Sequence, residues 1–131
     1  MQKSNFNWQL INDSITDGDR EALVKFIKTS KRWTNGPKVK QFEDKWSEWL
    51  GIKHSVFVNS GAMANYLMVA LMKETKGLGE VIVPAIGWVS DVSSLINLGM
   101  KPVFVDVKVN NFAMTLESIK NAVTEKTRGI V

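Results

Sequence analysis

The stretch "FVNSGAMANYLM", residues 57–68, passes from apolar residues through Asn-Ser-Gly directly into a helix-like run. A corner of this kind between a strand and a helix directs free backbone N–H groups, and the positive end of the helix dipole, toward an anion. We expect Gly61 to supply a backbone conformation that other residues avoid. The pattern predicts a phosphate-binding corner, with a merely structural turn as the alternative. It matches neither the P-loop nor the GxGxxG pattern, which argues against nucleotide hydrolysis and dinucleotide binding.

A second corner, "PAIGWVS" over residues 84–90, places a large indole beside a glycine. Trp88 follows a predicted strand and does not lie within a strand or in the middle of a helix. An exposed indole at such a corner is suited to stack on a flat ring. The alternative is that Trp88 is an ordinary packing residue.

The chain around these corners alternates between strand and helix patterns. Helices are predicted over 17–31, 37–50, 62–76, 90–98 and from 116 onward, and short apolar strands over 56–58, 80–83, 101–107 and 128–131. This alternation is typical of an α/β fold with a mainly parallel sheet and helices on both faces. In such folds ligands bind beyond the carboxyl ends of the strands, where both corners fall. We expect a single partial domain, with a helical segment over 1–54 and a βαβα portion over 55–131.

Local signals mark the ends of several helices. Thr16 followed by Asp19 predicts a capping box, and Thr115 predicts a second N-cap. Pro37 suits a first helical position, and Gly51 supplies the stop for the same helix.

Apolar residues recur at helical spacing in the first two helices. In the first helix these residues are Leu23, Phe26 and Ile27. In the second they are Val39, Phe42, Trp46, Trp49 and Leu50. The tryptophans are most simply explained as core residues.

Composition narrows the classes of function. The 131 residues carry a net charge of +4 and no cysteine, which excludes disulfides and thiolate metal sites. The lone His54 is expected to be a surface or packing residue, so no metal site is predicted. Basic and acidic residues are interspersed, apart from a small basic cluster within 28–40, so no nucleic-acid partner is expected. Without a signal peptide or a membrane-spanning run, the expected location is the cytoplasm.

Three separated segments occur in an order that resembles a known family: "TNGPKVKQFEDKWSEWLGIKHSVFVNSGAMANYLM", "EVIVPAIGWVSDVSSLINLGMKPVFVDV" and "LESIKNAVTEKTRGIV". Over residues 11–131 the chain is similar to the N-terminal part of the DegT-type sugar aminotransferases. These are pyridoxal phosphate (PLP) enzymes of the aspartate aminotransferase fold that act on keto-sugars attached to nucleotides. The resemblance implies an incomplete large domain that binds PLP or pyridoxamine phosphate (PMP), and a nucleotide-sugar substrate for the full-length family.

The resemblance also assigns site residues. The phosphate-binding corner falls on Ser60, Gly61, Ala62 and Met63. The ring that stacks on the pyridine face falls on Trp88. A Thr-x-Gly-Pro segment near the active-site entrance falls on Thr34, Gly36 and Pro37.

Two departures from the family pattern concern hydrogen bonding and charge. Relatives usually carry a hydroxyl at the position of Ala62, and the loss of one hydrogen bond to a charged oxygen costs about 1.5–3 kcal/mol. Asp91 stands where relatives often carry a small hydroxyl residue. We expect its carboxylate to lie unfavourably near an anionic cofactor.

The resemblance implies that the lysine of the Schiff base and the aspartate that protonates the pyridine nitrogen would follow residue 131. We therefore expect a truncated chain with no catalytic residue of its own and no transaminase activity alone. One alternative is a segment of a PMP-dependent sugar 3-dehydratase, in which a histidine replaces the lysine. Asn59, Asn65 and "VPAIGW" look closer to that branch. Another alternative is a non-catalytic module that oligomerises or binds a partner.

The resemblance has a consequence for assembly. It implies that strands from later in the family's chain separate the strand over 56–58 from the next two. Without them, the remaining strands expose edges that can pair with another copy. We expect a homodimer or higher oligomer, or a rearranged strand order.

Overall fold

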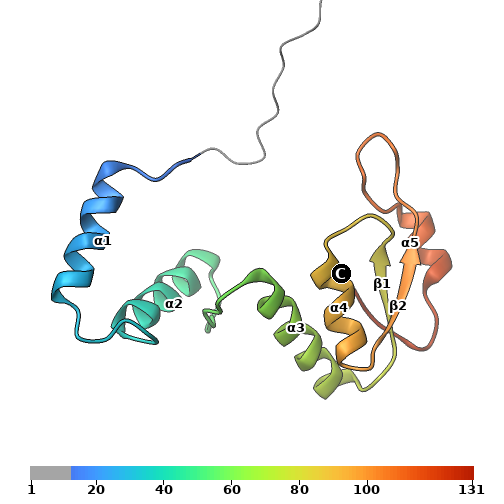
Figure 1. The fold of residues 1–131 in the computed structure, drawn as a ribbon. Coiled ribbons are helices and arrows are strands. Elements are labelled where there is room, and N and C mark those ends of the chain that lie inside the picture. Colours follow the sequence, from blue (N-terminus) through green and yellow to red (C-terminus); the bar gives the residue numbers. More distant parts are fainter. Residues whose placement is uncertain (1–12) are drawn as a thin grey trace, which may run out of the picture. The chain divides into compact units, whose positions relative to one another are not determined.

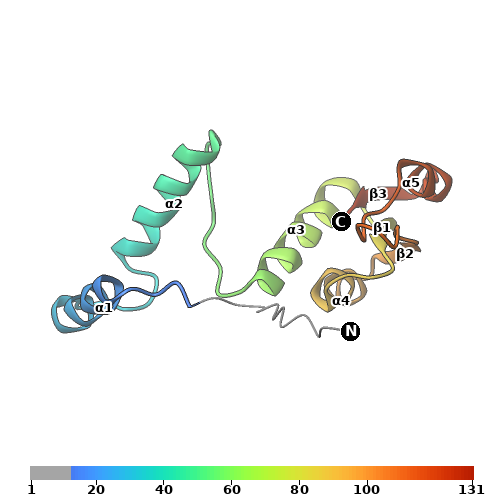
Figure 2. The same ribbon diagram turned by 90° about the horizontal axis from the view of Figure 1, so that it is seen from above.

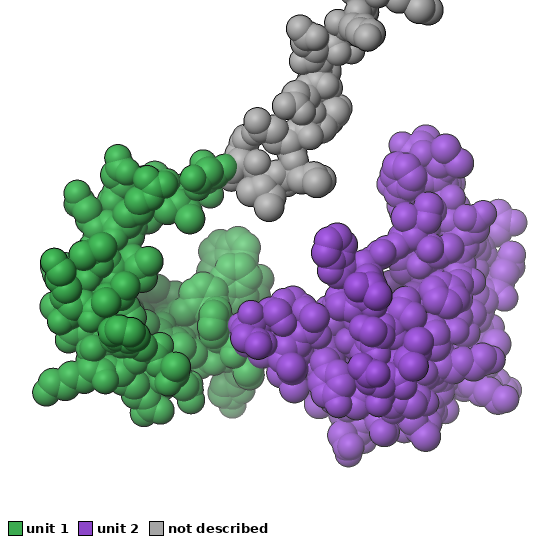
Figure 3. Space-filling view, in the orientation of Figure 1, with its two compact units in different colours: residues 1–57 green, residues 58–131 purple. Residues whose placement is uncertain are grey.

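The computed structural model describes residues 13–131 and divides the chain into two compact units, 1–57 and 58–131 (Figure 3). The boundary lies close to the expected division between a helical segment and a βαβα portion. The first twelve residues of the predicted helical segment lie outside the described residues. Whether the two units act as one domain stays a prediction.

The first unit contains the helices α1 (Asp17–Thr29) and α2 (Pro37–Leu50). The predicted capping box at the start of α1 is confirmed: the Asp19 N–H donates to Thr16 Oγ1 at 3.2 Å, and the Thr16 N–H donates to Asp19 Oδ2 at 2.8 Å. Pro37 occupies the first helical position of α2, and Gly51 ends the helix in the left-handed region with φ of 68°. Local sequence signals therefore set both ends of α2.

The apolar faces of these helices are exposed, so the expectation that Trp46 and Trp49 lie in a core is wrong. No described residue of α1 is buried, and in α2 only Ser47 is. The side chains of Trp46 and Trp49 are 44% and 73% exposed. Phe42 stacks on Trp46 with ring centroids 5.7 Å apart and meets Phe57 edge-on at 5.4 Å. One contact lies within α2 and the other joins it to Phe57 of the following segment, and together they leave Trp46 and Trp49 exposed.

The second unit is built on a parallel sheet in which β1 (Glu80–Pro84) lies between β2 (Lys101–Val105) and β3 (Thr127–Ile130). The helices α3 (Gly61–Lys76) and α4 (Val89–Asn97) cover one face, and α5 (Leu116–Ala122) covers the other (Figure 2). The predicted Thr115 cap of α5 is confirmed, because Thr115 Oγ1 accepts from the Ser118 N–H at 2.9 Å. The predicted α/β fold with helices on both faces is confirmed.

The central strand β1 carries the core of this unit. Val81 and Val83 pack with Val69 of α3 and Leu95 of α4. Ile82, between them in the strand, faces the opposite side of the sheet. All three β1 residues are fully buried. A strand covered on both faces needs an unbroken apolar run, which "VIV" provides.

The expected strand over 56–58 is not formed, which corrects the sequence prediction. Val56 is 75% exposed and Phe57 is 53% exposed. The segment pairs with none of the three strands, although β2 and β3 are edge strands of the sheet. It is held by side chains: the Phe57 N–H donates to Glu43 Oε1 at 2.9 Å, and Ser47 Oγ donates to Ser55 Oγ at 2.8 Å. An apolar run becomes a strand only where a neighbouring strand accepts its hydrogen bonds.

The buried Glu80 carboxylate joins the amino end of β1 to β2 and to the segment that follows α5. Glu80 accepts hydrogen bonds from Lys101 Nζ at 2.9 Å and from Thr124 Oγ1 at 2.7 Å. The bond from Lys101, followed by the bond from Thr124, holds the pKa of Glu80 below its ordinary value. Because the folded-state pKa is lowered, this stabilisation is present above the ordinary pKa and is lost as pH falls through the folded-state pKa.

We expect Glu80→Gln to lower the urea midpoint of unfolding at neutral pH, because the amide is a weaker partner for the Lys101 ammonium. The difference from the parent chain should shrink as the pH falls through the lowered pKa of Glu80, because the parent carboxyl group then takes up a proton. Glu74→Gln, which changes an exposed carboxylate of α3, is the matched control and should show little difference at either pH. A difference for Glu80→Gln that does not change with pH would contradict this account.

Candidate functional site

Helix α3 begins at the first predicted corner, with Ser60 as its N-cap. Ser60 Oγ accepts from the Met63 N–H at 3.2 Å, and the Ser60 carbonyl accepts from the Ala64 N–H at 3.1 Å. Within the described residues, the N–H groups of Gly61 and Ala62 donate to no acceptor. Of the predicted phosphate donors, Gly61 and Ala62 are therefore available, whereas the backbone of Met63 is already used by the cap.

The expectation about the conformation of Gly61 is wrong. Gly61 is the first residue of α3 and does not belong to the residues with positive φ, so any L-residue could adopt its backbone conformation. A Cβ atom at Gly61 would meet no atom within 4 Å. The absence of a side chain leaves the two free N–H groups open to a ligand.

The two corners lie at the same end of the sheet, where β1 and β2 have their carboxyl ends. Helices α3 and α4 run side by side and begin where β1 and β2 end (Figure 1). Asn65 Nδ2, in the second turn of α3, donates to Asp91 Oδ1 at 2.6 Å and to Ser90 Oγ at 3.1 Å in the first turn of α4. These bonds tie the start of α4 to the start of α3.

Trp88 is the N-cap residue of α4, and its side chain is 77% exposed. It lines a small cleft of about 150 Å³ together with Gly87, Asp91 and Phe104. Phe104 belongs to β2, next to Val83 of β1 in the register. The indole thus borders an apolar cleft at the carboxyl ends of two parallel strands.

The Asp91 carboxylate is less unfavourable for an anionic cofactor than the sequence predicted. One of its carboxylate oxygens accepts the short bond from Asn65. Its place in the first turn of α4 also sets the carboxylate near the positive end of the helix dipole. The carboxylate nevertheless lines the cleft beside Trp88, so the negative charge there disfavours a second anionic group.

The third predicted segment belongs to the other unit. Gly36 is the N-cap of α2 and Pro37 is its first residue. The Thr34 carbonyl accepts from Arg32 Nε at 3.0 Å. The backbone of this segment shapes the connection between α1 and α2, and the predicted role of Thr34, Gly36 and Pro37 at an active-site entrance stays a prediction.

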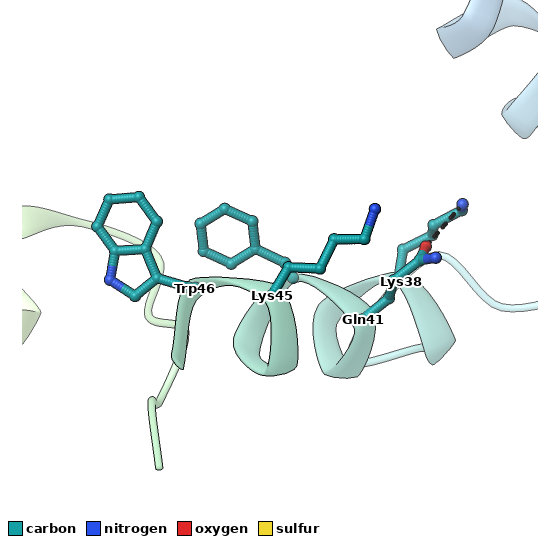
Figure 4. Close-up of a pocket in the computed structure, with 5 residues that line it drawn as sticks. Lys38, Gln41, Lys45 and Trp46 are labelled. Atoms are coloured by element: carbon teal, nitrogen blue, oxygen red, sulfur yellow. Dashed lines mark hydrogen bonds between the residues drawn. The ribbon is translucent and has the colours of Figure 1, made fainter. Parts of the chain in front are cut away.

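A wider groove of about 390 Å³ lies along α2 but holds none of the predicted site residues. Figure 4 shows Lys38, Gln41, Lys45 and Trp46 along the helix, with the Lys38 ammonium bonded to Gln41 Oε1 at 3.0 Å. The groove is lined by α2 alone, so no second helix or strand contributes side chains to it. The corner cleft, where two strands and a helix meet, is the better candidate site.

The sequence profile of the DegT/DnrJ/EryC1/StrS aminotransferase family matches residues 14–131. The chain belongs to this family. A fellow member, the GDP-4-keto-6-deoxy-D-mannose 3-dehydratase of Yersinia pseudotuberculosis, is 35% identical over the whole chain and 34% of its own length. GDP-perosamine synthase of Vibrio cholerae is 27% identical over 90% of the chain and 32% of its own length.

A solved structure of a family member has a fold similar to that of this chain. The E. coli GDP-4-keto-6-deoxy-D-mannose 3-dehydratase with bound hydrated PLP matches 95% of this chain and 33% of its own with a TM-score of 0.83 at 34% identity. The chain therefore spans about a third of the length of the curated relatives it matches. Within residues 13–131, every helix is too short or too polar to cross a bilayer.

Two residues were not assigned a role from the sequence: Phe104, which lines the cleft, and Asn65, which bonds to Asp91 of the cleft. Asn65 follows Ser60 by five residues, and its polarity within the mostly apolar α3 was the available signal. The bond to Asp91 could not be foreseen, because the two residues are 26 positions apart. Phe104 gave no signal beyond an apolar strand residue, since only the pairing of β1 and β2 brings it to the cleft.

We expect Ser60→Ala to lower the free energy of unfolding by about 0.5–2 kcal/mol, because the cap of the Met63 N–H is lost. Hydrogen exchange at the Met63 amide should become faster in the same variant. Ser93→Ala, an exposed change within α4, is the matched control and should leave stability unchanged or slightly raised, because alanine favours helix. Equal effects in the two variants would contradict the capping role.

Proposed function

We propose that residues 58–131 form the phosphate-binding and ring-binding part of a PLP or PMP site in an enzyme that acts on nucleotide-linked keto-sugars. The observation that carries the proposal is the pair of free N–H groups at Gly61 and Ala62, open to solvent, at the same end of the sheet as the exposed Trp88. The proposal is also supported by family members whose names describe sugar 3-dehydratases and by the PLP-bound structure of one of them.

The residues present fit a phosphorylated aromatic ring. The N–H groups of Gly61 and Ala62 would donate to phosphate oxygens, and the start of α3 adds a favourable dipole. The Ser60 hydroxyl accepts from the Met63 N–H and donates to Asn59 Oδ1 at 3.5 Å, and it would have to turn away from this long bond to donate to a phosphate oxygen. Trp88 would cover one face of the ring and keep water from it. The cofactor, when bound, would supply an electron sink for a substrate carbanion.

Ala62 makes this corner weaker than one with a hydroxyl at the same position. The Ala62 backbone still donates, but its side chain offers no further hydrogen bond. The missing bond to a charged oxygen corresponds to about 1.5–3 kcal/mol. We therefore propose that this corner depends more on the backbone and on ring stacking than a hydroxyl-bearing corner would.

For the reaction class, we favour the sugar 3-dehydratase over the aminotransferase, which the sequence pattern had placed first. The observation behind this choice is the identity of 35% with a 3-dehydratase against 27% with GDP-perosamine synthase. In either case the substrate class is a nucleotide-linked keto-sugar. A non-catalytic oligomerising module remains the alternative from a different class.

Calorimetric titration of the chain with PMP, and in parallel with pyridoxamine, tests the proposal. PMP carries an amine, so it cannot form imines with the lysines of the chain. We expect PMP to bind and pyridoxamine to bind far more weakly, because only PMP offers a phosphate to Gly61 and Ala62. Absence of PMP binding at millimolar concentration, with a melting temperature that rises with protein concentration alone, would favour the oligomerising module.

Trp88→Ala should weaken PMP binding by roughly two- to tenfold, which corresponds to the loss of one aromatic stacking contact. Ile86→Ala removes an exposed apolar side chain from the same loop and is the matched control, because Ile86 does not line the cleft. The two dissociation constants are compared by the same titration. A similar weakening in both variants would mean that the loop, and not the indole, carries the effect.

A further inference from the structure

We propose that Asn65 is a positioning residue that holds Trp88 in place through Asp91, so that one ligand can reach the phosphate corner and the indole together. This inference rests on the proposed function. Its geometric part concerns only the chain's own residues and can be tested without a cofactor.

Asn65 provides the directional link between α3 and α4. Its amide donates to Asp91 Oδ1 at 2.6 Å and to Ser90 Oγ at 3.1 Å, and the first of these bonds is strengthened by the carboxylate charge. Within the described residues, no other side-chain hydrogen bond joins the two helices. The rest of their interface is apolar and includes Val69 and Leu95. Apolar contacts tolerate small shifts, whereas a hydrogen bond fixes distance and direction.

Trp88 has little else to hold it. As the N-cap of α4 it makes no side-chain capping bond, and 77% of its side chain is exposed, so packing does not fix it. Its carbonyl accepts from the Asp91 N–H at 3.0 Å. The connection therefore runs from Asn65 of α3 to the Asp91 side chain, and from the Asp91 backbone to Trp88.

The test combines PMP titration with NMR of the full chain. Asn65→Leu should weaken PMP binding by no more than the two- to tenfold expected of Trp88→Ala, because Asn65 acts through that residue. In the Trp88→Ala background the same change should weaken binding less than about twofold, because the residue being positioned is absent. Asp91→Asn keeps an acceptor for Asn65 and should retain most of the affinity. Asn97→Leu, at the far end of α4, is the control and should have no effect.

The NMR measurement needs no cofactor. The Trp88 indole N–H signal is identified by its loss in Trp88→Phe, and its heteronuclear NOE reports motion of the ring. We expect this NOE to fall in Asn65→Leu and to stay at the parent value in Asp91→Asn and Asn97→Leu. An unchanged NOE in Asn65→Leu, or equal weakening of PMP binding with and without Trp88, would overturn the proposal. A parent chain that binds no PMP while the NOE falls as expected would instead contradict the proposed function alone.

Discussion

Burial of β1 on both faces is the constraint on which the second unit depends. Val81, Ile82 and Val83 are fully withdrawn from water, and each side of the strand needs its own covering helices. A parallel strand on either edge completes its hydrogen bonds. The crossover from β1 to β2 places the start of α4 where β1 ends, and Asn65 joins the start of α3 to it. The candidate site exists at that end of the sheet because β1 is central.

The two helix starts at this end of the sheet are chemically different. Ser60 caps α3, and the remaining N–H groups of its first turn face open space. At α4 the cap position carries an indole, and a carboxylate lies in the first turn. One start therefore attracts an anion while the other offers a flat apolar surface beside a negative charge. A ligand with a phosphate at one end and an aromatic ring at the other matches this polarity.

The first unit shows what local signals accomplish without a core. The Thr16 capping box, Pro37 and Gly51 are sufficient to set where α1 and α2 begin or end. The apolar faces of both helices stay exposed, because no described element of this unit covers them. Helix formation and helix burial are thus separate properties, and only the first is encoded within a few neighbouring residues.

The sequence by itself determined the features that depend on neighbours in the chain: the caps at Thr16, Thr115 and Gly51, the alternation of strand and helix, and the corner at Ser60. The tertiary structure decided the features that depend on residues far apart. It left residues 56–58 unpaired, because a strand requires a partner that local pattern cannot supply. It showed that Gly61 does not adopt the left-handed conformation and that the space beside its Cα is open. It also joined Asn65 to Asp91 across 26 positions, because a hydrogen bond depends on distance in space and not on separation in sequence.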